Sequence, residues 1–284
     1  MAVNPPRRPN PASVLLYGGT VLCLDARRSI HRRCEMLVQR GVVASLGRSL
    51  TITPGTRLLD VSGRIVVPGL VGVASQLAAQ PLGAEAPALL PHHDARTAAS
   101  TARAGAIDAL SNGVTTVCDV GVPGASVEVA DAVRSALEDA GIRSAASQRA
   151  PVGAVPVRGL AGLDGDRDEL VANTIGAAEV LGLHAEVGSV EVGKWADLVV
   201  LAVDADIDRL DDDELYGLVA SGRARIEHVL VAGAERIRDG ALTGAAAERG
   251  AADGVSTSDL SEPAPVDIAE TAATLRRRRD ASSA

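Results

Sequence analysis

The chain has 284 residues, of which 46% are apolar, with a net charge of −8 and a pI of about 5.2. The negative charge disfavours general nucleic-acid binding, and 1% aromatic residues leave little for base stacking. No apolar run approaches the roughly 20 residues of a membrane span, and three widely spaced cysteines fit a reducing compartment, so we expect a cytoplasmic protein with no nucleic-acid or membrane partner.

The first half of the chain carries short β-type runs separated by turn signals. Residues 1–12 contain four prolines and are expected to form a disordered leader. Gly18-Gly19 reads as a turn between two strands, and Arg40-Gly41 and Ser62-Gly63 each read as the tip of a hairpin. The pattern predicts a small antiparallel sheet or sandwich, with runs at 14–17, 20–24, 36–39, 42–46, 58–61 and 65–67.

The middle of the chain alternates between strand and helix patterns. A buried strand passes through a Pro68-Gly69 bend, and a helix is predicted over 100–112, ending at Asn112-Gly113. Amphipathic spacing predicts a second helix over 127–140, stopped by Gly141. With β runs at 114–119 and 142–147, this strand–helix–strand rhythm predicts parallel pairing.

The last part of the chain returns to short strands. A helix is predicted over 166–182, opened by Asp166 with Glu169 as a capping pair and ended by Gly182. A short helix over 211–220 has acidic residues in its first turn, and 226–240 reads as a closing hairpin. Residues 246–284 are expected to be a flexible tail, in which 266–279 could form a helix.

Three segments resemble the metal-dependent amidohydrolases, in particular the branch of cytosine and guanine deaminases and chlorohydrolases. Residues 64–77 (RIVVPGLVGVASQL) resemble the family's first barrel strand, Pro-Gly-Leu-(Ile/Val)-Asp-x-His-x-His-Leu, and 110–119 (LSNGVTTVCD) resemble its second. Residues 187–201 (VGSVEVGKWADLVVL) resemble its return into a β-sandwich, the most specific of the matches. In the family the two histidines of the first segment are metal ligands, and the aligned residues here are Ala74 and Gln76.

The resemblance covers both ends of the chain better than its middle. The interval from Gly69 to Gly193 is far shorter than the roughly 200 residues of an eight-unit barrel, and only three strands can be counted in it. We therefore predict an α/β fold with a composite β-sandwich built from both chain ends, over 13–66 and 184–245. A truncated, incomplete parallel β/α-barrel remnant lies between them, over 67–183.

The candidate site residues are few. A catalytic zinc or iron needs about three protein ligands and an open position, which Ala74 and Gln76 do not supply, so the resemblance implies a lost metal site and no cofactor. His92 and His93 are the only adjacent histidines, and a surface loop is the plainer interpretation of them. Asp119 ends a parallel strand, where α/β folds place functional groups, although it could simply cap the next loop.

Other polar and aromatic residues receive structural interpretations. Cys118 and Trp195 are expected in the core, Trp195 in that of the sandwich, while His31, His184 and His228 are expected to face solvent or an edge.

Two functions are compatible with these observations. The first is a degenerate amidohydrolase-like protein, catalytically inactive, acting as a partner or structural subunit in a homo- or hetero-oligomer. Its open barrel remnant would present a strand edge and an apolar face that need covering. The alternative is an active hydrolase or deaminase of non-peptide C–N bonds in a small molecule. It would hold zinc or iron in a rebuilt or partner-completed site with His92, His93 and Asp119.

Overall fold

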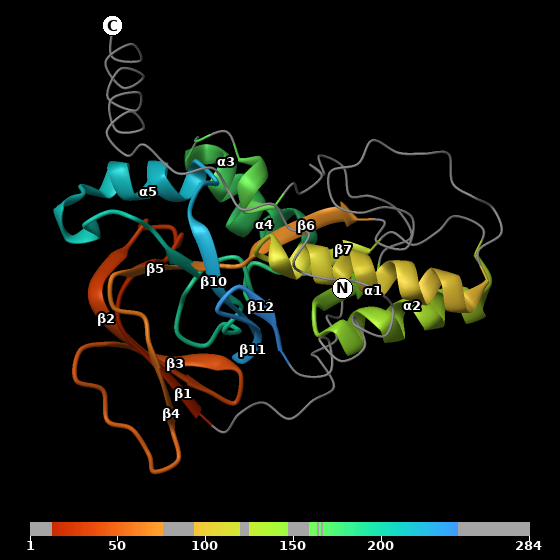
Figure 1. The fold of residues 1–284 in the computed structure, drawn as a ribbon, viewed down its shortest axis with the longest axis horizontal. Helices are drawn as coiled ribbons and strands as arrows, with labels where there is room; N and C mark the ends of the chain where they lie inside the picture. Colours follow the sequence, from red (N-terminus) through yellow and green to blue (C-terminus); the bar gives the residue numbers. More distant parts are fainter. Residues whose placement is uncertain are drawn as a thin grey trace, which may run out of the picture.

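The computed structural model describes residues 13–75, 94–119, 125–146, 159–163, 165 and 167–243. Two sheets and the helices packed on them make up this part of the chain (Figure 1). The predicted leader, the His92-His93 pair and the tail with its possible helix all lie outside the described residues. None of the helices in the described ranges is both long and apolar enough to cross a membrane.

The larger sheet has nine strands drawn from both ends of the chain, so residues far apart in sequence share one sheet. Its order is β12-β11-β10-β9-β5-β1-β2-β3, with β4 also paired to β1, and the antiparallel pairing of β5 with β9 joins the two chain ends. The strands are β1 Ser13–Leu22, β2 Ile30–Gln39, β3 Val42–Gly47, β4 Arg57–Asp60, β5 Arg64–Pro68, β9 Leu198–Ala202, β10 Arg225–Val231, β11 Ala234–Arg238 and β12 Ala241–Leu242.

The two runs on either side of Gly18-Gly19 form one bulged strand, β1, so the predicted turn is wrong. The predicted hairpin at Ser62-Gly63 is also wrong, because β4 and β5 both run parallel to β1, one beside each half of it. The reason is close packing at the bulge. A Cβ on Gly18 would lie 2.2 Å from the Ser62 Oγ, and one on Gly19 would lie 2.9 Å from Val61. Any side chain at positions 18 and 19 would clash with the 61–63 segment, so only glycines allow this segment to pack so closely against β1.

The other two predicted hairpins are confirmed, at Arg40-Gly41 between β2 and β3 and at Ala232-Gly233 between β10 and β11. One face of the large sheet encloses a cluster of buried Val, Leu, Met and Cys side chains. Because Met36 of β2 and Leu230 of β10 both belong to this cluster, the sheet curves around it. A core of this composition agrees with a sequence that contains no phenylalanine.

The smaller sheet has three parallel strands in the order β6-β7-β8, and the predicted strand–helix–strand rhythm is confirmed. Asp94 caps the first helix, which therefore begins before the predicted start, whereas the second has the predicted bounds and ends at Gly141 with φ 83°. The elements are β6 Leu70–Ser75, α1 Ala95–Ser111, β7 Val114–Asp119, α2 Val127–Ala140 and β8 Arg143–Ala146.

Helices cover both faces of this small sheet (Figure 1). α1 and α2 pack on one face, and α4 (Ala177–Leu181) packs on the other against Val71, Cys118 and Ala145. α4 continues α3 (Arg167–Val171) through a π-helical turn, η2 (Ala172–Gly176). The apolar face that the sequence analysis left open is therefore buried inside the chain, and the predicted core position of Cys118 is confirmed.

The helix α5 (Asp212–Ala220) lies in the connection between β9 and β10 of the large sheet. It confirms the short helix predicted over 211–220, and it begins at a capping box in which Asp211 and Glu214 bond each other's backbone. Two short 3-10 turns, η1 (Leu160–Gly162) and η3 (Ile207–Arg209), complete the described elements.

Candidate functional site

The carboxyl ends of the three parallel strands form one edge of the small sheet. Ser75 of β6 lies in register with Asp119 of β7, and Asp119 with Ala146 of β8. Asp119 therefore ends the central strand at the edge where α/β folds hold ligands. Ala74 belongs to the same end of β6, whereas Gln76, His92 and His93 lie outside the described residues.

The two positions aligned with the family's metal-binding histidines carry other residues. Ala74 has no donor atom, and Gln76, the other aligned position, carries only a neutral amide. A catalytic zinc takes its ligands from histidine, cysteine and carboxylate side chains. Within the ranges that the structure describes, no three such side chains gather closely enough to hold a metal ion.

A buried ion pair lies at the opposite, amino end of the small sheet. Arg143, the first residue of β8, donates from Nε to the Asp197 Oδ2 at 2.7 Å and from Nη2 to the Oδ1 at 2.9 Å, and neither side chain is more than 3% exposed. Its guanidinium also stacks 4.7 Å from the Trp195 ring centroid. Burial by itself lowers the pKa of Arg143, but the charge and hydrogen bonds of Asp197 raise it by more, so the guanidinium keeps its positive charge.

Asp197 is also a junction between the two sheets. Its Oδ1 accepts from the Ala232 backbone N at 2.7 Å, at the β10–β11 turn, and its Oδ2 from the Thr116 hydroxyl of β7 at 3.3 Å. Its backbone carbonyl accepts from the Gly69 N at 3.0 Å. One carboxylate thus connects β7 and β8 with the large sheet just before β9.

Sequence reasoning found the motif that contains Asp197 but not its partner. The available signal was Arg143, a long charged residue that opens a strand made otherwise of small residues. Trp195 was expected in the sandwich core, yet it packs instead beside the cluster of α4 and the small sheet. The reason is the attraction of its ring for the buried Arg143 cation.

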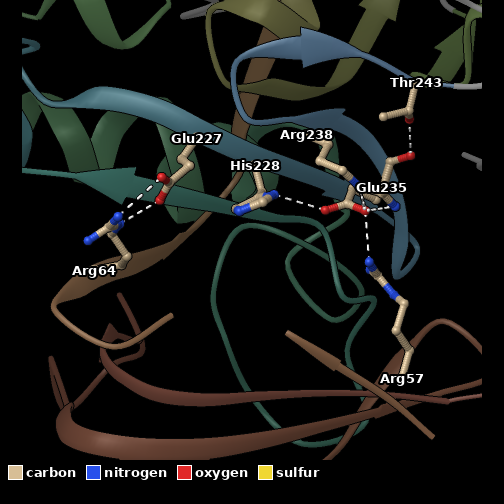
Figure 2. Close-up of polar contacts among 7 residues, drawn as sticks. All are labelled: Arg57, Arg64, Glu227, His228, Glu235, Arg238 and Thr243. Atoms are coloured by element: carbon tan, nitrogen blue, oxygen red, sulfur yellow. Dashed lines mark hydrogen bonds and ion pairs between the residues drawn. The ribbon is translucent and has the colours of Figure 1, made fainter. Parts of the chain in front are cut away.

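A second polar cluster lies on the large sheet (Figure 2). Glu235 of β11 is only 4% exposed and accepts from the His228 Nδ1 at 2.9 Å, the Arg57 Nη1 at 2.9 Å and the Arg238 Nε at 2.8 Å. Burial raises the pKa of Glu235, but the hydrogen bonds and positive charges of these partners lower it more, to about 2. The cluster links β4, β10 and β11 and contains no nucleophile.

The solvent-facing position predicted for His228 is wrong, because its side chain is buried against Glu235. A register shift between Ile226 and His228 in the pairing of β10 with β9 breaks the alternation on which that prediction rested. The neighbouring Glu227 pairs with Arg64 of β5 instead (Figure 2). His31 and His184 are exposed, as predicted.

The sequence profile of the Amidohydrolase family matches residues 168–236, a range that includes Asp197 and the β10–β11 turn. A 5-methylthioadenosine/S-adenosylhomocysteine deaminase from Symbiobacterium thermophilum is 29% identical over 172 residues, covering 55% of this chain and 36% of the deaminase. A dihydroorotase from Citrifermentans bemidjiense is 39% identical over 59 residues, covering 21% of this chain and 13% of that enzyme.

Solved structures show the same fold. A zinc-bound adenosine deaminase from Xanthomonas campestris superimposes with a TM-score of 0.63 at 14% identity, covering 96% of this chain and 99% of that one. A zinc complex of an atrazine chlorohydrolase from Arthrobacter aurescens superimposes with a TM-score of 0.58 at 15% identity. The match covers 93% of this chain and 99% of the chlorohydrolase.

The chain is thus similar to the amidohydrolase family in sequence over residues 168–236 and to its members in fold. It spans only about a third of the length of the deaminase that it matches. For this amidohydrolase-like chain the buried Arg143–Asp197 pair is the best-defined polar centre within the described residues, and it is a structural junction rather than a reaction centre.

Proposed function

We propose that this chain is a non-catalytic member of the amidohydrolase superfamily that acts as a partner or structural subunit. The observation that carries the proposal is Ala74, which lies at the carboxyl end of β6, the strand that resembles the metal-binding strand of the family. A methyl group can neither coordinate a metal nor activate water, so β6 supplies no metal ligand at this position.

The packing of the small sheet supports the same proposal. In a closed barrel, side chains from the other strands fill the space next to the inner face of each strand. In this chain Ala177, Ala178 and Leu181 of α4 pack on that face. α4 therefore substitutes for missing strands in burying apolar surface, but it brings no further strand ends to the edge where Asp119 lies.

The contact with a partner is proposed at the edges of the small sheet. Among the described residues, β6 and β8 pair only with β7, so each has one side without a strand neighbour. Unpaired strand edges are templates for pairing with another chain. Since both faces of the sheet are covered, the edges are the favoured contact, either with a second copy or with a different subunit.

A second candidate is an active hydrolase of C–N bonds, favoured by the position of Asp119 at the end of the central parallel strand. The related proteins whose names describe an activity include a deaminase and a chlorohydrolase. In this candidate a partner subunit, or His92 and His93, would complete a set of ligands with Asp119.

One experiment separates the two candidates. Protein purified without chelators is analysed for zinc and iron and for mass in solution, together with an Ala74→His/Gln76→His variant that restores the family histidines. We expect well under one metal per chain in both proteins, and a discrete oligomer or a stoichiometric complex. About one tightly held metal per wild-type chain, with C–N hydrolysis that Asp119→Asn abolishes, would establish the second candidate instead.

A further inference from the structure

A cavity of about 380 Å³ lies on the large sheet, away from the edge that carries Asp119. It forms where the β1 bulge, the crossing between β4 and β5, and the turn after β9 come together. Its wall is made mostly of small or polar residues, and the full set is Gly18, Thr20, Arg33, Ser62, Gly63, Ala205, Asp206, Ile207 and Asp208.

The charges at this cavity compensate one another. Arg33 of β2 donates from Nε and Nη2 to the Asp208 carboxylate, the first contact at 3.1 Å. Asp206 pairs with Arg209 at 3.0 Å. A charged ligand would meet groups whose charge is already compensated, whereas a neutral ligand could hydrogen-bond to carboxylate lone pairs that the arginines leave free.

A polar group without a protein partner also lines the cavity. Thr20 is 1% exposed and is part of the cavity wall, and its hydroxyl forms no hydrogen bond within the described part of the chain. A hydroxyl in this position can both donate a hydrogen bond to a ligand and accept one from it. The hydroxyl of Ser62 lies on the same wall, next to the glycines of the bulge.

From this geometry we propose that the cavity binds a small neutral polyol, of the size of a pentose, with the Thr20 hydroxyl as its innermost contact. Such a ligand both donates and accepts through several hydroxyls. It can therefore satisfy Thr20 and the outer lone pairs of Asp206 and Asp208 without displacing Arg33. Ala205 and Ile207 supply the apolar part of the wall against its carbon skeleton. This proposal does not depend on whether the chain is catalytic.

The test is a titration of isotope-labelled protein followed by amide chemical shifts. D-ribose is the polyol probe, and ethylenediamine and succinate are the cationic and anionic probes. We expect ribose to give saturable shifts centred on the Gly18 and Gly63 amides, and the charged probes to give none there. Thr20→Val, which keeps the shape of the side chain, should weaken ribose binding about threefold to tenfold, the effect of one lost hydrogen bond.

Two further variants keep the test decisive if Thr20→Val does not fold. Ala205→Leu adds volume inside the cavity and should abolish the ribose shifts, while Thr56→Val, an exposed hydroxyl outside the cavity, should leave them unchanged. The proposal is overturned by an absence of saturable ribose shifts in the wild type or by shifts centred elsewhere. Preferential binding of either charged probe, or equal affinities in wild type and Ala205→Leu, would overturn it as well.

Discussion

The two sheets of this chain are stabilised in different ways. The nine-stranded sheet curves around its own apolar cluster and holds the polar cluster of Glu235 between its strands. The three-stranded sheet has short strands and shares its core with helices on both faces. Its polar anchor, Asp197, comes from outside the sheet, in the segment that leads into β9.

The small parallel sheet therefore depends on the large one for its polar anchor. A barrel strand normally has a strand on each side, and here only β7 does among the described strands of the small sheet. Asp197 and the close packing of Gly69 against Thr115 attach the small sheet to the large one. In a complete barrel, further strands would give this support. Mutations at the attachment and inside the large sheet should consequently have separable effects.

The strongest destabilisation is expected from Asp197→Asn. This change leaves Arg143 buried without a counter-charge, which costs about 3–5 kcal/mol of the free energy of unfolding. Denaturant unfolding measures the loss. Native-state hydrogen exchange should show faster exchange in α1, α2 and β6–β8 than in β1–β3.

Asp206→Asn is the matched control, since its pair with Arg209 is exposed at 60% and 85% and contributes at most about 1 kcal/mol. Equal acceleration of exchange in both sheets after Asp197→Asn would contradict the dependence of one on the other.

The next effect is a pH dependence that belongs to the large sheet. The pKa of Glu235 falls to about 2 in the folded protein, from an ordinary value of 4.5. Its contribution of about 3 kcal/mol is therefore fully present above pH 4.5 and is lost as the pH falls from 4.5 towards 2. Denaturant unfolding across this range should show the loss in the wild type and a flatter profile in Glu235→Gln.

The control for this pH profile is Asp239→Asn, which changes an exposed carboxyl group just after β11. It should retain the wild-type slope between pH 4.5 and 2. If Glu235→Gln kept that slope as well, the acid sensitivity of the large sheet would have to come from another group.

A smaller effect is expected at Gly69, where the chain passes from β5 of the large sheet to β6 of the small sheet. A Cβ on Gly69 would lie 2.1 Å from the Thr115 Oγ1, so Gly69→Ala must push β6 away from β7. We expect a loss of about 1–3 kcal/mol in thermal or denaturant unfolding. Gly47→Ala, whose Cβ would meet Leu50 at an ordinary 3.4 Å, should cost less. Equal costs for the two variants would show that the crossing is not a tight contact.

Local sequence patterns were sufficient to predict many of the elements and the position of the candidate edge. Amphipathic spacing and Gly141 defined α2, the Arg40-Gly41 turn defined the hairpin of β2 and β3, and Asp119 was correctly expected at the end of a parallel strand. These features depend on residues within a few positions of one another, where periodicity and turn chemistry act directly.

The way these elements join could be seen only in the folded chain. Arg143 and Asp197 are 54 residues apart, and Thr116 and Asp197 are 81 apart, so no local pattern pairs them. The bulge in β1, the buried position of His228 and the covering of the small sheet by α4 likewise depend on contacts between distant segments. A period-2 or period-3.6 pattern shows that a residue is buried but not which distant segment buries it, because that choice follows from packing of the whole chain.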